Sequence, residues 1–223
     1  MPDISIAERI RIAHAISEKV KIIKESQDPR LMSFETLYAP LNEEEKALLQ
    51  FVQNINPHEH GFNGEFFGIQ DVPADLTKIT DALGEQFATE KVAAAFQEMN
   101  DAILRDINQK VKVFSAYRSP AYQLIVFLWN LRETQFDIPR VCKAVTKPGY
   151  SEHGAAHRQA LDIMPVEEST PTTGPGTTFH HTAQYAWIKQ NAHKFGFHES
   201  YPENNSAGIQ YEPWHWHYEA PQA

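Results

Sequence analysis

The chain has 223 residues, 42% of them hydrophobic and 22% charged, which suits one globular domain, or one domain with a helical extension. The formal net charge of −9 argues against a nucleic-acid partner, because affinity for nucleic acids comes mainly from Lys and Arg neutralising phosphates. No stretch approaches the roughly 20 apolar residues that a membrane span requires, so we expect no membrane-spanning segment.

The first part of the chain is predicted to be mainly helical. Its N-terminus is charged and amphipathic, so we expect either a protein made without a secretion signal or a signal outside this sequence, and the compartment stays open. Apolar residues at helical spacing predict a helix over residues 5–26. Asn42, followed by three glutamates, predicts the N-cap of a helix that ends near Asn54. Glycines, with aromatic residues that look exposed, interrupt regular structure over residues 61–68.

Helices and strands then alternate. Residues 89–109 and 122–134 have the pattern of helices, and the alternating stretch 111–115 between them predicts a strand. Cys142 is the single cysteine, which excludes an internal disulfide and a cysteine-type zinc site. It precedes residues 143–146, which we interpret as a strand, and we expect it to be a packed core residue rather than a nucleophile.

The C-terminal third completes the predicted fold. The pattern predicts a strand over 161–164, a loop rich in Thr, Pro and Gly over 169–178, a helix over 181–195 closed by Gly196, and a last strand over 210–219. Helices packed on a small antiparallel sheet make an α+β fold. We expect residues 1–88 to form a helical N-terminal extension packed on a catalytic domain of residues 89–223.

Two short segments about fifty residues apart supply the side chains that a catalytic zinc site needs. Such a site has three protein ligands, an open coordination position and a general base beside the bound water. His153, Asp162 and His215 can be the ligands, and Glu212 can be the base, because zinc lowers the pKa of a bound water towards about 7. Taken singly, a Glu-x-x-His triplet is a weak signal and an Asp after an apolar run is usually a cap. The combination predicts a zinc hydrolase with one Zn²⁺ per chain.

Four motifs that occur in order add to this prediction. They are Ser115-Ala116-Tyr117-Arg118-Ser119 with Gln123, Lys147-Pro148-Gly149-Tyr150-Ser151-Glu152-His153, Ala160-Leu161-Asp162-Ile163, and Gly196-Phe197 with Tyr211-Glu212-Pro213-Trp214-His215-Trp216. Together they resemble the D-alanyl-D-alanine carboxypeptidases of the LAS zinc peptidases, named after lysostaphin, D-Ala-D-Ala carboxypeptidase and sonic hedgehog. The likeness covers residues 89–219, and residues 1–88 contribute nothing to it.

The resemblance implies a role for each matching residue. The two histidines and the aspartate at positions 153, 162 and 215 would bind zinc, and Glu212 would act as general base and then protonate the leaving amine. Arg118 would stabilise the scissile carbonyl as it becomes an oxyanion. Ser151 and Gln123 would hold the substrate peptide. Without the resemblance, an isolated arginine such as Arg118 is usually a solvated surface group.

Two positions depart from the family pattern. The family has seven positions from its first zinc histidine to the aspartate, whereas His153 and Asp162 are nine apart. Either two extra residues bulge out, or His157 is the ligand; we favour His153 because its Ser-Glu-His context is intact. His217 stands where the family commonly has Arg, and on a strand it faces the same way as His215. We expect it to support the ligands or to line the cleft.

The resemblance implies a zinc-dependent D,D-carboxypeptidase that hydrolyses the terminal D-Ala-D-Ala bond of peptidoglycan stem peptides. Enzymes with the same fold hydrolyse other peptide bonds, so an L,D-carboxypeptidase, a D-Ala-D-Ala dipeptidase and an endolysin-type L-Ala-D-Glu peptidase remain alternatives. A non-catalytic zinc-containing binding module is the alternative from another class. The presence of both Glu212 and Arg118 argues against it, because a structural zinc needs neither. The oligomeric state stays open.

Overall fold

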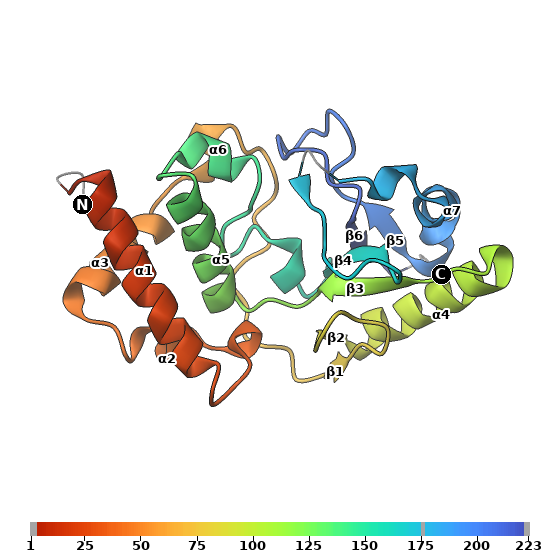
Figure 1. Cartoon of the computed structure of the whole chain (residues 1–223), viewed down its shortest axis with the longest axis horizontal. Helices are drawn as coiled ribbons and strands as arrows, with labels where there is room; N and C mark the ends of the chain where they lie inside the picture. The colour runs from red at the N-terminus through yellow and green to blue at the C-terminus, as the bar shows by residue number, and fades with distance from the viewer. Residues whose placement is uncertain (1–3, 175–176, 221–223) are drawn as a thin grey trace. The chain divides into compact units, whose positions relative to one another are not determined.

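The chain forms two compact units that alternate along the sequence (Figure 1). The computed structural model describes residues 4–174 and 177–220, so residues 175 and 176 of the predicted loop lie outside the described residues. Unit 1 comprises Met1–Val72, Arg118–Gly154 and Ser206–Ile209, and unit 2 comprises Pro73–Tyr117, Ala155–Asn205 and Gln210–Ala223. The division at residue 88 into an extension and a catalytic domain stays a prediction.

Unit 1 consists of α-helices and short 3-10 helices. They are α1 (Ile6–Ile23), η1 (Pro29–Leu31), α2 (Phe34–Tyr38), α3 (Glu43–Gln53), η2 (Pro57–His60), α5 (Pro120–Glu133), α6 (Ile138–Cys142) and η3 (Glu152–Gly154). The helices predicted over residues 5–26, 42–54 and 122–134 are confirmed to within a few residues. None of the helices in the described ranges combines the length and the apolar composition that crossing a bilayer needs.

The core of unit 1 joins segments that are distant in the sequence. α1, α3 and α5 pack against one another (Figure 1). Each of these helices contributes buried apolar side chains to one core cluster, among them Ile12, Ile16, Leu48, Leu49, Leu124, Phe127 and Leu128. Residues before position 72 therefore cover the helix that follows Arg118, and removal of the N-terminal helices would expose apolar surface on α5.

Helix α3 begins with a reciprocal cap. Asn42 Oδ1 accepts a hydrogen bond from the Glu45 backbone N at 2.9 Å, and the Glu45 carboxylate accepts one from the Asn42 backbone N at 2.8 Å. This capping box satisfies two N–H groups that would otherwise lack partners at the helix start.

Asn42→Ala is therefore expected to lower the free energy of unfolding by about 1 kcal/mol, because it removes the acceptor for the Glu45 N–H. Urea denaturation measures the change. Gln50→Ala, on the exposed face of the same helix, serves as the control and should change the free energy by less than about 0.5 kcal/mol. Equal effects of the two substitutions would contradict the assignment of the cap.

Cys142 ends a helix rather than preceding a strand, so the predicted strand over 143–146 is wrong. Asp137 caps the start of α6 by accepting from the Arg140 backbone N at 3.1 Å, and Pro139 lies in the first turn, where its missing N–H removes no helical bond. The thiol is nonetheless buried in the core of unit 1, as expected of a packed residue. Burial raises its pKa, which makes it a poor nucleophile.

Unit 2 combines helices with two small sheets. Its elements are β1 (Leu76–Lys78), β2 (Phe87–Thr89), α4 (Glu90–Ile107), β3 (Val111–Ser115), β4 (Ala160–Pro165), η5 (Phe179–His181), α7 (Ala183–Asn191), η6 (Ala192–Phe195), β5 (Phe197–Glu199) and β6 (His215–Tyr218). β1 pairs with β2, and the second sheet has the order β3-β4-β6-β5, with every pair antiparallel. The α+β class predicted from the sequence is confirmed.

Alternation along the strands gives the larger sheet two different faces. Leu161, Ile163 and Trp216 join a buried apolar cluster with residues of α4 and α7, such as Phe96 and Ile188. α4 and α7 therefore pack on this face (Figure 1). Because successive side chains of a strand point to opposite faces, the residues between them in β4 and β6 turn away from that cluster.

Two predicted elements differ in part from expectation. The helix predicted over 181–195 is α7 followed by the 3-10 turn η6, and it ends as predicted at Gly196, whose φ of 81° suits glycine. The last strand is shorter than the predicted range of 210–219. Pro213 lacks an N–H and lies in a turn closed by a 3.1 Å bond from the His215 N to the Glu212 carbonyl, so pairing begins only at His215.

Candidate metal centre

The pairing register of two strands places Asp162 directly opposite His215. These residues are Cα partners of β4 and β6, on the face turned away from the apolar cluster. His215 Nδ1 and Asp162 Oδ1 lie 2.8 Å apart, and both side chains are buried. A β-bulge in β3 between Val113 and Ser115 lies beside Asp162, a position where bulges commonly redirect side chains at functional sites.

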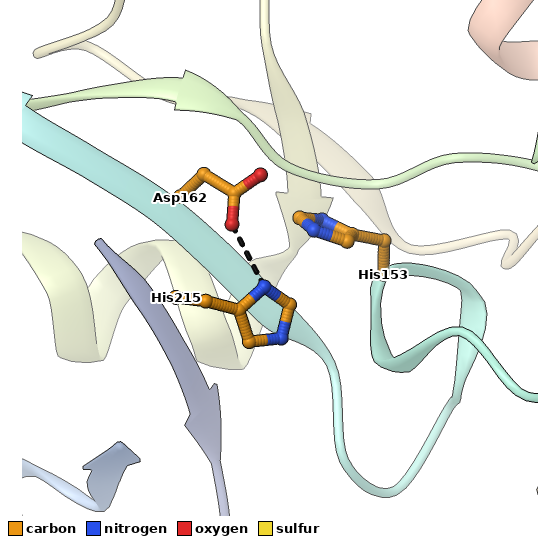
Figure 2. A group of neighbouring side chains, drawn as sticks. All are labelled: His153, Asp162 and His215. Atoms are coloured by element: carbon orange, nitrogen blue, oxygen red, sulfur yellow. Dashed lines mark hydrogen bonds and ion pairs between the residues drawn. The ribbon is translucent and has the colours of Figure 1, made fainter. Parts of the chain in front are cut away.

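His153 completes a cluster of three potential metal ligands. It comes from η3, is 3% exposed, and offers a nitrogen that lies within 4.8 Å of the donor atoms of Asp162 and His215. Figure 2 shows the three side chains pointing towards one another. The backbone of η3 is held by Arg118, whose N donates to the His153 carbonyl at 3.3 Å. Gly154 permits this approach, since a Cβ there would lie 2.9 Å from the Arg118 carbonyl oxygen.

The donor set fits a zinc ion. Two imidazole nitrogens and one carboxylate oxygen are ordinary zinc ligands, and three protein ligands leave the fourth position of a catalytic site open. Two donors that are each about 2.1 Å from one ion are at most about 4.2 Å apart. Separations of no more than 4.8 Å can therefore close on a single ion through small side-chain movements.

Glu212 places a second carboxylate beside the cluster. Its Oε2 lies 4.0 Å from His215 Nδ1, and its side chain is largely buried. The backbone orients it, because the Glu212 N donates to the Tyr201 carbonyl at 3.0 Å. A carboxylate in this position can accept a proton from a molecule bound next to the ligands.

Tyr201 is a component of the site that the sequence did not indicate. Besides accepting from Glu212, it places its ring 4.8 Å from the His215 imidazole, and the residue is buried. It therefore supports one candidate ligand with its ring and the candidate base with its carbonyl. A tyrosine before a proline in an irregular segment has no distinctive pattern, so the contact of Tyr201 with His215 becomes visible only in three dimensions.

Arg118 and Gln123 form a pair within unit 1. Arg118 Nη1 donates to Gln123 Oε1 at 3.0 Å, and Gln123 Nε2 donates to the Thr146 carbonyl at 2.6 Å. Gln123 is 2% exposed, so its amide is engaged by the protein on both sides. The bond to Gln123 helps to orient the guanidinium of Arg118, a group suited to recognition of a carboxylate or a polarised carbonyl.

Ser151 carries a buried hydroxyl that lacks a hydrogen-bond partner among the described residues. The residue is 6% exposed and lies two positions before His153. Buried hydroxyls are nearly always paired, so an unpaired one beside a candidate metal ligand indicates a group that another molecule can satisfy.

The longer spacing between His153 and Asp162 is taken up by an exposed turn. His157 lies in this turn and is exposed, whereas the cluster that the structure brings together contains His153. Arg158 of this turn forms an ion pair with Glu219, the residue that follows β6.

His217 faces the same way as His215, as alternation along a strand predicts. It is buried, its Nδ1 lies 2.7 Å from Ser200 Oγ, and its ring stacks on His198 at 5.6 Å. Its Nε2 lies 3.3 Å from Glu219 Oε1. His217 is thus held in a polar network next to the candidate ligands and is absent from the metal cluster.

Comparisons with known proteins agree on one family. The family described as VanY, D-alanyl-D-alanine carboxypeptidase, matches residues 85–221. YodJ of Bacillus subtilis (strain 168) is 30% identical over 160 residues, and the D-alanyl-D-alanine carboxypeptidase of Enterococcus faecium is 28% identical over 170 residues. The matches cover 68% and 75% of this chain, which spans about half the length of these relatives, 55% and 44% respectively.

Solved structures show the same fold. The LD-carboxypeptidase LdcB is 26% identical, with a TM-score of 0.58 over 73% of this chain and 78% of that one. A vancomycin-resistance D,D-pentapeptidase VanY variant in complex with Zn(II) is 22% identical, with a TM-score of 0.50 over 68% and 79% of the two chains. VanYB in complex with D-Ala-D-Ala is 23% identical, with a TM-score of 0.51 over 69% and 86%. The two VanY structures support the fold assignment alone.

Proposed function

The chain belongs to the VanY family of D-alanyl-D-alanine carboxypeptidases, which are zinc peptidases, and on this premise we propose that it is a zinc-dependent D,D-carboxypeptidase. Its substrate would be a peptidoglycan stem peptide, from which it would remove the terminal D-alanine. The observation that carries the proposal is the buried carboxylate of Glu212, whose Oε2 lies 4.0 Å from His215 Nδ1, beside a cluster of three residues that could bind a metal ion. A binding module would need the ligands but not the adjacent base.

Each candidate residue has a distinct task in this proposal. His153, Asp162 and His215 hold the ion, which when bound supplies Lewis acidity and lowers the pKa of water. Glu212 accepts a proton from the attacking water and returns it to the amine that leaves. The 3.0 Å bond from its backbone N to Tyr201 keeps the carboxylate beside the ligands.

The remaining candidates act on the peptide. Arg118 stabilises the negative charge that develops on the scissile carbonyl oxygen, and its bond to Gln123 prepares the guanidinium for that task in advance. Gln123 therefore acts by positioning Arg118. Ser151 donates its unpaired hydroxyl to the substrate peptide.

An L,D-carboxypeptidase is the second candidate function. The observation in its favour is the likeness to LdcB, which is described as an LD-carboxypeptidase and is 26% identical. Both activities use the same ligands and base, so the choice between them depends on the chirality of the residue before the scissile bond. The likeness to a D-alanyl-D-alanine carboxypeptidase of Enterococcus faecium favours the D,D specificity.

Mass spectrometry of two stem peptides, incubated with zinc-loaded protein, tests the proposal. A pentapeptide ending in D-Ala-D-Ala should lose one alanine, and a tetrapeptide ending in an L-centre followed by D-Ala should stay intact. Prior removal of zinc by a chelator should abolish the reaction, and added zinc should restore it. Cleavage of the tetrapeptide alone would replace the D,D assignment by the L,D one. Stability of both peptides with zinc bound would favour the binding module.

A further inference from the structure

Unit 1 contains a pocket of about 530 Å³ beside the segment that leads to His153. Ile55 comes from the chain after α3, Phe66 and Ile69 from the irregular segment after η2, and Lys147 and Tyr150 from the motif that ends at His153. Much of the lining therefore comes from residues before position 85, outside the region matched by the family.

The walls of the pocket are held in place by close contacts. The Phe67 backbone N donates to the Gly149 carbonyl at 2.7 Å, and the rings of Phe66 and Tyr150 lie 4.9 Å apart. Gly149 has φ +83°, and a Cβ at this position would collide with the ring of Phe66. Only glycine adopts this conformation readily and admits the ring so close to the backbone. Phe62, which looked exposed in the sequence, is buried with its ring 5.5 Å from Tyr150 and supports the same wall.

The entrance of the pocket exposes apolar side chains. Phe66 and Ile69 both line the pocket, yet Phe66 is 55% and Ile69 57% exposed. Large exposed apolar residues that gather in one short segment commonly mark a place where another molecule binds. Together with the ring of Tyr150, they offer an apolar surface to the stem of a ligand.

Lys147 gives the pocket a buried positive charge. The residue is 5% exposed, and its Nζ donates to the carbonyl of Gln53 at 2.5 Å and to that of Ile55. No carboxylate of the described residues contacts it. Burial lowers its pKa to about 8, as expected for an ammonium group withdrawn from water without a counter-charge. An ammonium has three donors, so one is left after the two carbonyls.

We propose that this pocket is a subsite for an acidic residue of the substrate peptide, with its aliphatic part against Phe66, Ile69 and Tyr150 and its carboxylate at Lys147. The proposal rests on the carboxypeptidase function for the direction of the peptide. A carboxypeptidase has one residue on the leaving side of the scissile bond, so the acidic residue lies on the other side.

The length of the intervening chain sets the reach. Tyr150 and Lys147 precede His153 by three and six residues, which span at most about 11 and 21 Å. An extended peptide covers that range within about six residues. An acidic residue two to five positions before the scissile bond is therefore suited to the pocket.

Calorimetric titration of the full-length, zinc-loaded Glu212→Gln protein tests the subsite without turnover. The probes are pentapeptides ending in D-Ala-D-Ala that carry one acidic residue two or three positions before the scissile bond, and twins in which that side-chain carboxylate is an amide. We expect at least one acidic peptide to bind about tenfold more tightly than its twin, the range of a charge-assisted hydrogen bond. Lys147→Met should bring this ratio to within about twofold, whereas Lys143→Met, an exposed lysine four positions earlier, should leave it unchanged.

A second pair of variants keeps the test valid if Lys147→Met fails to fold. Ile69 is exposed, so both Ile69→Asp and Ile69→Asn should fold normally. Ile69→Asp should weaken binding of the acidic peptide more than that of its amide twin, because the two negative charges repel each other. Ile69→Asn should weaken binding of both peptides alike. The subsite would be overturned if the protein without a pocket substitution bound both twins equally or bound neither peptide. It would also be overturned if Lys147→Met and Ile69→Asp left the ratio of the two affinities unchanged.

The outcomes for the subsite and for the activity are independent. If the protein cleaves neither stem peptide but still prefers the acidic peptide in a way that depends on Lys147, the carboxypeptidase function would be refuted and the subsite would be supported. Removal of D-alanine with no preference for an acidic residue would do the reverse. If Lys147 serves only to bind the carbonyls at the end of α3, its replacement should change the thermal stability and leave the ratio of the two affinities intact.

Discussion

Glu212→Gln is expected to lower kcat/KM for a D-Ala-D-Ala peptide by about 10²- to 10⁴-fold, the contribution of a positioned general base. The amide has nearly the same shape as the carboxylate but cannot accept the proton of the attacking water. Zinc content should stay near that of the unaltered protein, because Glu212 is not among the three clustered ligands. Release of D-alanine and elemental analysis of the same sample measure the two quantities.

Glu203→Gln provides the matched control for this substitution. Glu203 is an exposed glutamate in the loop before Glu212, so its replacement makes the same chemical change away from the ligands. Its kcat/KM should remain within about twofold of the original value, as for most surface substitutions. Activity of Glu212→Gln close to that of the control would remove Glu212 from the mechanism, and loss of zinc would instead make it a ligand.

His153→Ala is expected to abolish tight zinc binding, while His157→Ala should retain it. The first substitution leaves only two of the three clustered donors, whereas the second alters an exposed side chain outside the cluster. A ligand that binds only the folded state raises the melting temperature. Added zinc should therefore stabilise His157→Ala as much as the unaltered protein and have little effect on His153→Ala. Thermal melts at matched zinc concentrations, together with zinc content after dialysis, measure the difference.

The opposite pattern would have a definite structural meaning. If His157→Ala loses zinc and His153→Ala keeps it, the turn at 156–157 must fold inwards when the ion binds, and His157 would be the ligand five positions before Asp162. Loss of zinc in both variants would point to a rearrangement of the whole loop. Retention of catalysis in zinc-loaded His153→Ala would exclude His153 from the site in either case.

Local patterns in the sequence predicted the elements that depend on nearby residues. The cap at Asn42, the strand that ends at Ser115 and the helix stop at Gly196 all follow from interactions within a few residues, and all three are confirmed. The α+β class and the family are confirmed as well. The strand expected after Cys142 was wrong, because the backbone N atoms of Lys143, Ala144 and Val145 bond back to the carbonyls of Arg140 and Val141 in a turn that follows α6.

The tertiary structure decided what depends on residues far apart in the sequence. Motif order suggested His153, Asp162 and His215 as ligands, but the antiparallel register of β4 and β6 is what puts the last two opposite each other. Shifting that register by one residue would send one of them to the apolar face. The contact of Tyr201 with His215 and the placement of Lys147 at the end of α3 likewise arise from long-range packing. The periodicity of nearby residues does not predict such long-range contacts, because the free energy that stabilises them comes from surfaces that meet only when the chain folds.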